Sequence, residues 1–375
     1  MQEYWQKKPL LIRGAIPAFT LDSQNGSTNL ASPISYEELV EFANQENLES
    51  RLIQSDPWRF QHGPFQKKTI PNLNKPNWTL LLQGMEAHHL AAANILSWFR
   101  FIPDARLDDL MISIAGIGGG VGPHFDSYDV FLIQMSGRRK WRISEQKDLS
   151  LNPELPFKIL QHFQSEFEWI LEPGDMLYLP PHIAHDGIAL DAGCQTWSVG
   201  FRSPSFKELL QEGLWRLAES LENIPELDKK FSDPKQPATL QAEQLPKELI
   251  KQLNAQLQKL KLNQINTFLP GVTAYLSEPK QQAIFESPSK PLNSKAFLKK
   301  LTQGKLKTSP QTRILSLGKK VYCNGDEVTK NQTAKVIAAW NALSANKYLE
   351  NANLGGIHES SLYEAYLAGW LVFEV

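Results

Sequence analysis

Short apolar runs separated by turn residues dominate the chain from about residue 5 to residue 203, and they restrict the fold more than any other feature. This part is rich in aromatic residues, glycine and proline. We expect strands at residues 110–115, 130–135, 140–143, 176–179 and 196–201, and helices at 36–44 and 86–99. Because the strands are short and regularly interrupted, alternating βαβ units are excluded. The pattern predicts an all-β barrel or sandwich with helices near its start.

After residue 203 the pattern changes to helices. Amphipathic helices are predicted at residues 206–221 and 245–260, and the tail combines a strand pair at 313–317 and 320–322 with helices at 334–343 and 360–367. We therefore predict three domains: residues 1–203, a helical region 204–265, and a winged-helix-like domain 266–375. Two helices on a long connection bury little by themselves, so we expect their apolar stripes to face another chain or the barrel, and a homodimer is the simpler interpretation.

Composition excludes several classes of protein. The 39 basic and 40 acidic residues give a net charge of −1, with 42% hydrophobic and 21% charged residues, which fits neither a polybasic nucleic-acid binder nor a disordered acidic chain. Cys194 and Cys323 are too few for a disulfide framework or a cysteine zinc site. No apolar run is long enough for a membrane span or a secretory signal. We expect a cytoplasmic protein that binds neither membranes nor, directly, nucleic acid.

The stretch GIGGGVGPHFDSYDVFLIQMSGRRKW, residues 116–141, contains a candidate metal site. If His124 and Asp126 lie in a strand, its two-residue period points both side chains to one face, where they can chelate one metal ion. A histidine of the later segment GDMLYLPPHIAHDG would complete the set. Two histidines and one carboxylate leave three coordination positions open, which favours ferrous iron over zinc.

His182 and His185 compete for the third ligand position. The turn at Gly174 and Asp175 and the strand at 176–179 precede a double proline, which carries the chain round into a returning strand that begins near His185. His182 then falls in the turn and faces solvent. This pattern favours His185 as the third ligand.

Arg139 follows Asp126 by one strand and a turn at Gly137, so it can return toward the metal from the neighbouring strand. A buried guanidinium there would bind a carboxylate through two hydrogen bonds, as the distal acid group of 2-oxoglutarate requires. The neighbouring basic residues form either a solvated edge, which we favour, or a contact for ribosomal RNA or an acidic peptide: Arg138, Lys140 and Arg142.

Other conspicuous residues have structural interpretations. The glycines before His124 do not open a helix, so they are no dinucleotide-binding loop, and we expect them to let backbone pass close to the metal and the substrate. His88 and His89 are expected to be structural residues on a helix. Trp141 and Tyr178 are expected to pack within the barrel.

These motifs together resemble the JmjC-type 2-oxoglutarate oxygenases. The resemblance rests on HxD, on Gly137, Arg139 and Trp141 in their spacing, and on GDxLYxPPxxxH. The segments DDLMIS, GGGVGPHFD, YDVFLIQ, GRRKWR and SVGFR further resemble the bacterial ribosomal oxygenases, over the whole chain. The resemblance implies a mainly β fold with helices, a JmjC (cupin) double-stranded β-helix barrel followed by a helical dimerisation region and a winged-helix-like C-terminal domain.

The resemblance also implies an activity. It implies hydroxylation of an arginine of large-subunit ribosomal protein L-sixteen, with ferrous iron, 2-oxoglutarate and dioxygen as cofactors and succinate and carbon dioxide as products. His124, Asp126 and His185 would bind iron, Arg139 the distal carboxylate, and Ser113 and Ser198 other parts of the cosubstrate. Two alternatives remain open: the same chemistry on another residue, such as a ribosomal histidine, and a catalytically silent cupin that regulates through nucleic acid.

Overall fold

The computed structural model describes residues 1–16, 32–155, 157–235, 237–238, 244–262, 264–355, 357 and 360–374. The chain forms two compact units. One consists of Met1–Ser203 with Gln282–Ile284, and the other of Pro204–Gln281 with Phe285–Val375. Each unit has its own hydrophobic core.

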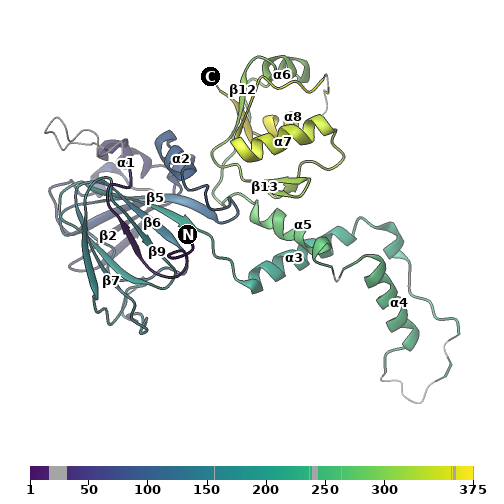
Figure 1. Ribbon diagram of the computed structural model, residues 1–375, viewed down its shortest axis with the longest axis horizontal. Coiled ribbons are helices and arrows are strands. Elements are labelled where there is room, and N and C mark those ends of the chain that lie inside the picture. The colour runs from purple at the N-terminus through teal and green to yellow at the C-terminus, as the bar shows by residue number, and fades with distance from the viewer. Residues whose placement is uncertain are drawn as a thin grey trace. The chain divides into compact units, whose positions relative to one another are not determined.

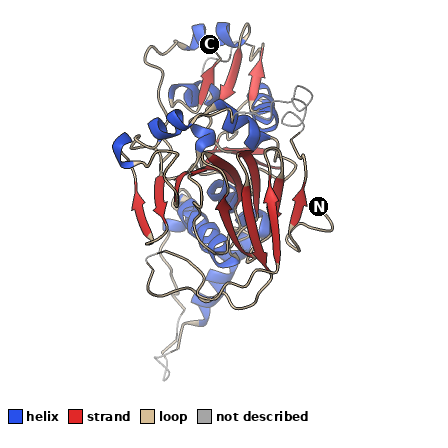
Figure 2. Cartoon of the chain, turned by 90° about the vertical axis from the view of Figure 1, so that its left-hand side faces the viewer, coloured by secondary structure: helices blue, strands red, loops and turns tan. Residues whose placement is uncertain are grey.

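Two antiparallel sheets make up the barrel of the first unit (Figures 1 and 2). In its described part the larger sheet has the strand order β1-β9-β6-β11-β5-β4-β2-β3, and the smaller one the order β10-β7-β8. The strands are β1 (Leu10–Ile12), β2 (Ser50–Gln54), β3 (Arg59–His62), β4 (Trp78–Leu82), β5 (Leu107–Ala115), β6 (Val130–Ser136), β7 (Arg139–Ser144), β8 (Phe167–Leu171), β9 (Met176–Leu179), β10 (Ala184–Ala189) and β11 (Cys194–Phe201). This is the predicted mainly β barrel.

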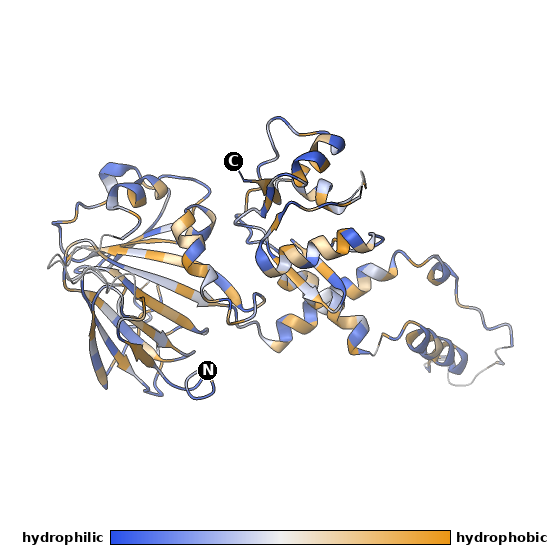
Figure 3. Ribbon diagram, turned by 45° about the horizontal axis from the view of Figure 1, so that its top comes forward, coloured by the Kyte–Doolittle hydropathy of each residue, from blue (hydrophilic) through white to orange (hydrophobic). Residues whose placement is uncertain are grey.

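The larger sheet is buried on both faces. Its outer face forms one core with helices α1 (Tyr36–Phe42) and α2 (Leu90–Ser97), which Figure 1 shows at one side of the barrel. Its inner face contacts the smaller sheet through a second cluster: Val130, Leu132, Trp141, Ile143, Leu171, Leu177 and Leu179. Figure 3 shows hydrophobic residues along these strands. The space between the two sheets is therefore the barrel interior.

Strand β11 shows how the sequence sets the two faces. All its residues are buried, yet polar and apolar residues alternate from Thr196 to Val199. Trp197 and Val199 belong to the outer core under the helices. Because successive side chains point to opposite faces, Thr196 and Ser198 point into the barrel. The barrel interior is thus lined in part by the hydroxyl groups of Thr196 and Ser198.

Helices of the second unit begin at α3 (Phe206–Leu221), where Ser205 and Glu208 form a capping box. Its Gly213 packs against α5 (Ile265–Leu276), because a Cβ at this position would lie 2.3 Å from the Phe268 ring. Helix α4 (Lys247–Lys259) also lies in this unit. The domain boundary predicted at residues 265 and 266 falls at the start of α5.

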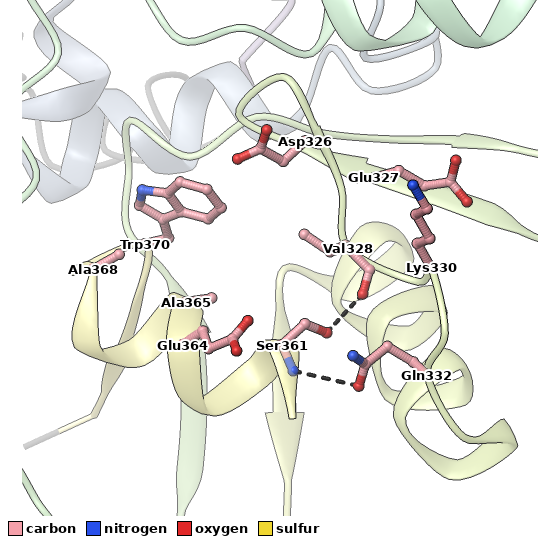
Figure 4. A pocket seen from close by; sticks show the side chains of 10 residues that line it. All are labelled: Asp326, Glu327, Val328, Lys330, Gln332, Ser361, Glu364, Ala365, Ala368 and Trp370. Carbon is pink, nitrogen blue, oxygen red and sulfur yellow. Dashed lines mark hydrogen bonds between the residues drawn. The ribbon is translucent and has the colours of Figure 1, made fainter. Parts of the chain in front are cut away.

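The C-terminal part of this unit has small antiparallel sheets and three further helices around the buried side chain of Trp340. The elements are α6 (Ser294–Leu301), β12 (Lys305–Thr308), β13 (Ile314–Leu317), β14 (Lys320–Cys323), β15 (Asp326–Glu327), α7 (Ala334–Asn346), β16 (Tyr348–Glu350), α8 (Ser361–Leu367) and β17 (Leu371–Phe373). A cavity of about 270 Å³ lies between β15 and α8, where Trp370 forms one wall and Ser361 donates a hydrogen bond to the carbonyl of Val328 (Figure 4).

The five strands predicted in the first unit are present as β5, β6, β7, β9 and β11, and the helix predicted at 206–221 is α3. The predicted helix at 86–99 is shorter, since a 3-10 turn at Met85–Ala87 precedes α2. His88 and His89 lie between these two elements, and His89 caps α2 by accepting a hydrogen bond from Ala91 N–H at 3.2 Å. Among the described residues, no helix is long and apolar enough to cross a membrane.

Candidate metal centre

His124, Asp126 and His185, which we call the triad, converge at the start of β10. One ligand atom of each side chain lies within 4.8 Å of those of the other two. His124 and His185 exchange two backbone hydrogen bonds, of 2.9 and 2.8 Å, which hold their rings 4.2 Å apart. The Nε2 atom of His185 lies 3.7 Å from Oδ2 of Asp126. This arrangement can coordinate one metal ion on a single face.

Both histidines present Nε2 to the site. Nδ1 of His124 lies 2.9 Å from the carbonyl of Gly122, and Nδ1 of His185 lies 2.9 Å from the carbonyl of Ile183. A carbonyl only accepts hydrogen bonds, so each Nδ1 carries the proton and each Nε2 keeps its lone pair. Burial lowers the pKa of His185 to about 4, against a smaller opposing effect of Asp126. His185 is therefore neutral, as a metal ligand must be.

His182 lies outside the site. It is exposed, adopts a left-handed backbone with φ of 66°, and donates its backbone N–H to the carbonyl of Asp126 at 2.7 Å. Strand β10 starts two residues later and carries the buried His185 inward. The structure thus places the two histidines as the turn argument predicted.

The expectation that His124 and Asp126 lie in a strand was wrong. Residues 116–129 run outside the named strands between β5 and β6, and only His124 makes an isolated bridge, to His185. Because the loop is bound to β10 by backbone hydrogen bonds, it still brings the two side chains together. Gly118 N–H donates to Ala189, and Ala189 N–H to Gly119, both at 2.8 Å.

The glycines of this loop allow close backbone approach to the neighbouring strands, while the expected approach to the metal and the substrate stays a prediction. A Cβ at Gly119 would lie 2.1 Å from the carbonyl oxygen of Trp78, and one at Gly120 would lie 2.6 Å from that of Gly187. Any larger residue would push the loop away from β4 and β10. The glycines therefore allow residues 116–129, which we call the metal loop, to pack closely against the barrel.

Arg139 carries an incompletely paired charge inside the barrel. Arg139 is 3% exposed. Within the described residues, the only hydrogen bond of its guanidinium runs from Nη1 to the carbonyl of Gly187, at 3.5 Å. Nε and Nη2 have no partner there. The guanidinium also lies 5.9 Å from the ring centre of Trp141, whose own ring centre lies 5.8 Å from that of His185. A buried cation with unpaired donors fits a carboxylate ligand between Arg139 and the metal ligands.

Ser113 and Ser198 both face the interior. Ser198 lies opposite Leu132 of the inner cluster, and Ser113 opposite Thr196, whose side chain shares the inner face. The hydroxyl of Ser113 donates to the carbonyl of Thr196 at 3.1 Å. Both hydroxyls therefore line the barrel in which Arg139 is buried.

The basic residues next to Arg139 are paired with acidic side chains. Arg138 binds Asp191 at 3.0 Å, Lys140 lies 3.7 Å from Glu168, and Arg142 binds the buried Asp186. These pairs agree with the solvated edge that the sequence favoured.

Sequence reasoning missed two groups near the triad, Asp109 and Tyr128. A Cβ at Gly200 would lie 3.5 Å from Oδ1 of Asp109 and 3.8 Å from the ring of Tyr128, so both contact the same point of β11. The Tyr128 side chain is 42% exposed, but the protein atoms around its hydroxyl and the carboxylates of Asp126 and Asp109 raise its pKa, so it stays protonated. Asp109 is 4% exposed and accepts hydrogen bonds from Gln83 and from Gly84 N–H. The alternation of β5, which puts residue 109 on the face of Ser113, was the signal that could have found it.

Comparisons with known proteins agree with this site. A family model described as a JmjC domain matches residues 94–209. The chain is 33% identical to the ribosomal protein uL16 3-hydroxylase of Escherichia coli over 98% of this chain and 94% of that protein. The chain belongs to the ribosomal oxygenases of the JmjC family. It is thus a 2-oxoglutarate-dependent oxygenase that uses ferrous iron.

Two further comparisons support this membership. A probable ribosomal oxygenase of Haemophilus influenzae is 32% identical over 56% of this chain and 50% of that protein. The solved structure of the ribosomal oxygenase YcfD from Escherichia coli, in complex with cobalt and 2-oxoglutarate, matches with a TM-score of 0.78 and 30% identity, and covers 100% of this chain and 97% of that one. The donor set of this chain fits the same kinds of ligand: two imidazoles and a carboxylate for a metal ion, and a buried guanidinium with unpaired donors for an acid.

Proposed function

We propose that this oxygenase hydroxylates an arginine side chain of ribosomal protein uL16 and converts 2-oxoglutarate to succinate and carbon dioxide. The observation that carries the proposal is that the triad and the unpaired guanidinium of Arg139 lie in one barrel, in a chain similar to a uL16 3-hydroxylase over nearly its full length. One atom of dioxygen would enter the arginine and the other the succinate.

Each residue at the site has a proposed part. His124, Asp126 and His185 would hold the iron, and Arg139 would bind the distal carboxylate of 2-oxoglutarate, with Ser113 and Ser198 lining the same space. When bound, iron and 2-oxoglutarate supply the oxidising power. The protein fixes the distance between cosubstrate and target and excludes water by the apolar inner cluster.

Asp109 favours arginine over histidine as the target. Its buried carboxylate lies beside Gly200 and Tyr128, and Tyr128 follows the metal ligand Asp126 by two residues and interacts with both acids. A guanidinium entering there would gain a charge-assisted hydrogen bond from a nearly desolvated acid, whereas a neutral imidazole would gain less. The hydroxyl of Tyr128 can add a further polar contact.

The test is intact-mass and fragment-ion spectrometry of a uL16 peptide after incubation with the enzyme, ferrous iron, 2-oxoglutarate and air. The expected product carries one added oxygen on an arginine, and a peptide with that arginine replaced by lysine should stay unmodified. A peptide that stays unchanged while 2-oxoglutarate is consumed would refute the substrate and leave the oxygenase, with histidine peptides as the next substrates. Absence of consumption, together with a shift of a DNA fragment at moderate salt, would favour the silent regulator.

Exposed apolar stripes support a homodimer. On α3 Phe206, Leu210 and Leu214 recur every four residues and are 85%, 53% and 58% exposed. On α4 Ile250 and Leu257 belong to a similar exposed stripe. Such faces occur at protein interfaces, and a second copy of the chain offers the matching surface. Light scattering behind size exclusion should give twice the mass of one chain.

The remaining assignments follow from the same membership. We propose that residues 204–265 are the dimerisation region, that residues 266–375 are winged-helix-like, and that the protein acts in the cytoplasm, where ribosomal proteins are made. Direct binding of nucleic acid is not part of this function, since the net charge is −1. A gel-shift assay with ribosomal RNA fragments at moderate salt should show no complex.

A further inference from the structure

A buried carboxylate, Asp129, lies three residues after the metal ligand Asp126 and has no part in the proposed binding of metal, cosubstrate or peptide. Its side chain is fully buried. The hydroxyl of Tyr178 donates to Oδ1 at 2.6 Å, and Gln6 Nε2 and Arg106 Nη2 donate to Oδ2 at 3.0 and 3.2 Å. The partners come from β9, from the segment before β5 and from the N-terminus of the chain, so one acid connects three distant segments.

The N-terminal partner is held from both sides. Gln6 N–H donates to the hydroxyl of Tyr178 at 2.7 Å, and the ring of Trp5 stacks on that of Tyr178, with centres 5.6 Å apart. The guanidinium of Arg106 lies over the Trp5 ring, 5.8 Å from its centre. We call Trp5 and Gln6 the N-terminal clamp. The clamp contacts Tyr178, the side chain of β9 that also binds Asp129.

Gln6 adopts a strained backbone to make these contacts. Its φ is 56°, in the left-handed region that a residue with a Cβ enters at a cost of about 1 kcal/mol. Gln6 itself is exposed, so packing of its side chain does not require this conformation. In this conformation Gln6 makes both hydrogen bonds, to Tyr178 and to Asp129. Strain of this kind persists where the surrounding contacts select it.

Asp129 lies where it can fix the position of the metal loop. Tyr128 contacts the inner residue Gly200, while Asp129 points to the outer side with Phe131 and Tyr178. The loop from His124 to Asp129 lies outside the named strands, so its course depends on a few contacts, one of which is the hydrogen bond from His182 N–H to the carbonyl of Asp126. At its start it is bound to His185, and at its end it is bound by Asp129, whose carbonyl also accepts from Phe201 N–H at 3.0 Å.

We propose that the N-terminal clamp acts through Asp129 as a positioning device for the metal loop, so that residues 5 and 6 of the chain set the geometry of Asp126 and Tyr128 from outside the barrel. Asp129 and Gln6 are positioning residues and contact neither metal nor substrate. The proposal does not depend on the identity of the protein substrate, because it concerns binding of the metal ion.

The test measures Co²⁺ binding by the visible absorption of the bound ion, which reports both affinity and coordination geometry. The variants are Asp129→Asn, which keeps the shape and removes the charge, and Gln6→Ala, an exposed position where folding should be unaffected. The matched control is Asp175→Asn. Asp175 is also a buried acid that binds the N-terminal segment, through Arg13 and Gly14 N–H. It lies in the turn before β9, whereas the metal loop leads into β6 at Val130, which pairs with the other end of β9.

We expect about tenfold weaker Co²⁺ binding and an altered absorption band in D129N, a smaller change of the same kind in Q6A, and wild-type binding in D175N. Unchanged Co²⁺ affinity and spectrum in Q6A and in folded D129N would overturn the proposal. An equal loss in all three variants would also overturn it, because the clamp would then only stabilise the barrel. If D129N fails to fold, Q6A and D175N decide the question between them.

Discussion

Replacing Arg139 by methionine should separate two effects of a buried, incompletely paired cation. Arg139 is 3% exposed, and two of its guanidinium nitrogens have no partner among the described residues. In the protein without cosubstrate this charge is a cost, whereas with 2-oxoglutarate bound it becomes a carboxylate clamp. Methionine keeps much of the length and removes the charge. The variant should therefore be more stable than the wild type without 2-oxoglutarate, and 2-oxoglutarate should raise its stability hardly at all.

The magnitudes follow from the unpaired atoms. Hydrogen bonds to charged groups contribute about 1.5–3 kcal/mol each, so losing two of them weakens 2-oxoglutarate binding by about 3–6 kcal/mol, or roughly 10²- to 10⁴-fold. Relief of the unsatisfied charge should stabilise the free protein by about 1–3 kcal/mol. For a domain of this size each kcal/mol corresponds to about 2–4 °C in melting temperature.

The assay is thermal unfolding of the Co²⁺-loaded protein with and without 2-oxoglutarate. A ligand at one hundred times its dissociation constant stabilises the wild type by about 2.7 kcal/mol, and R139M should gain almost nothing at that concentration. The control is Arg138→Met, since Arg138 is exposed and paired with Asp191, and this variant should keep the wild-type response. A full 2-oxoglutarate shift in R139M, or a lower melting temperature in its absence, would refute the reasoning.

Three further predictions concern the proposed activity. His124→Ala or Asp126→Ala should abolish 2-oxoglutarate consumption while the far-ultraviolet circular dichroism stays unchanged, and measurable turnover in either variant would contradict the ligand assignment. Asp109→Asn should lower kcat/KM for the arginine peptide about tenfold to hundredfold and leave peptide-independent 2-oxoglutarate consumption intact, whereas equal losses in both assays would show that Asp109 acts on the cosubstrate. Leu214→Glu should convert the dimer to monomer in light scattering, and a persistent dimer would place the interface elsewhere.

The sequence predicted the barrel because its signals are local. Short strands such as 130–136 and 194–201 carry their own apolar residues and turn signals, and helix 206–221 carries both its periodicity and its capping box. The N-terminal strands β2 and β4 and the helix α5 were missed. Strand β4 is buried on both faces and does not alternate, and α5 contains Pro270, which the pattern reads as a break.

The metal ligands were predicted through a wrong local structure. HxD was expected in a strand, yet residues 124 and 126 come together in a loop that backbone bonds to His185 and Ala189 hold in place. Those bonds join residues 61 to 71 positions apart, so no local pattern contains them. The selection of His185 over His182 did succeed, because it depended only on the turn and strand that surround the two residues.

Three aspartates within one short stretch show what only the tertiary structure can assign. Asp109, Asp126 and Asp129 are chemically identical, but one is a buried acid beside Gly200, one lies with two histidines, and one is bound on the outer side by the N-terminal clamp. Their partners decide this: backbone and amide donors at Asp109, imidazoles at Asp126, a phenol and a guanidinium at Asp129. Because a neutral amide at each position would remove a different partner, the same Asp→Asn change should impair peptide hydroxylation, abolish metal binding or weaken it, respectively. Three distinct phenotypes from one substitution type would tie the function of each acid to its surroundings and not to its place in the motif.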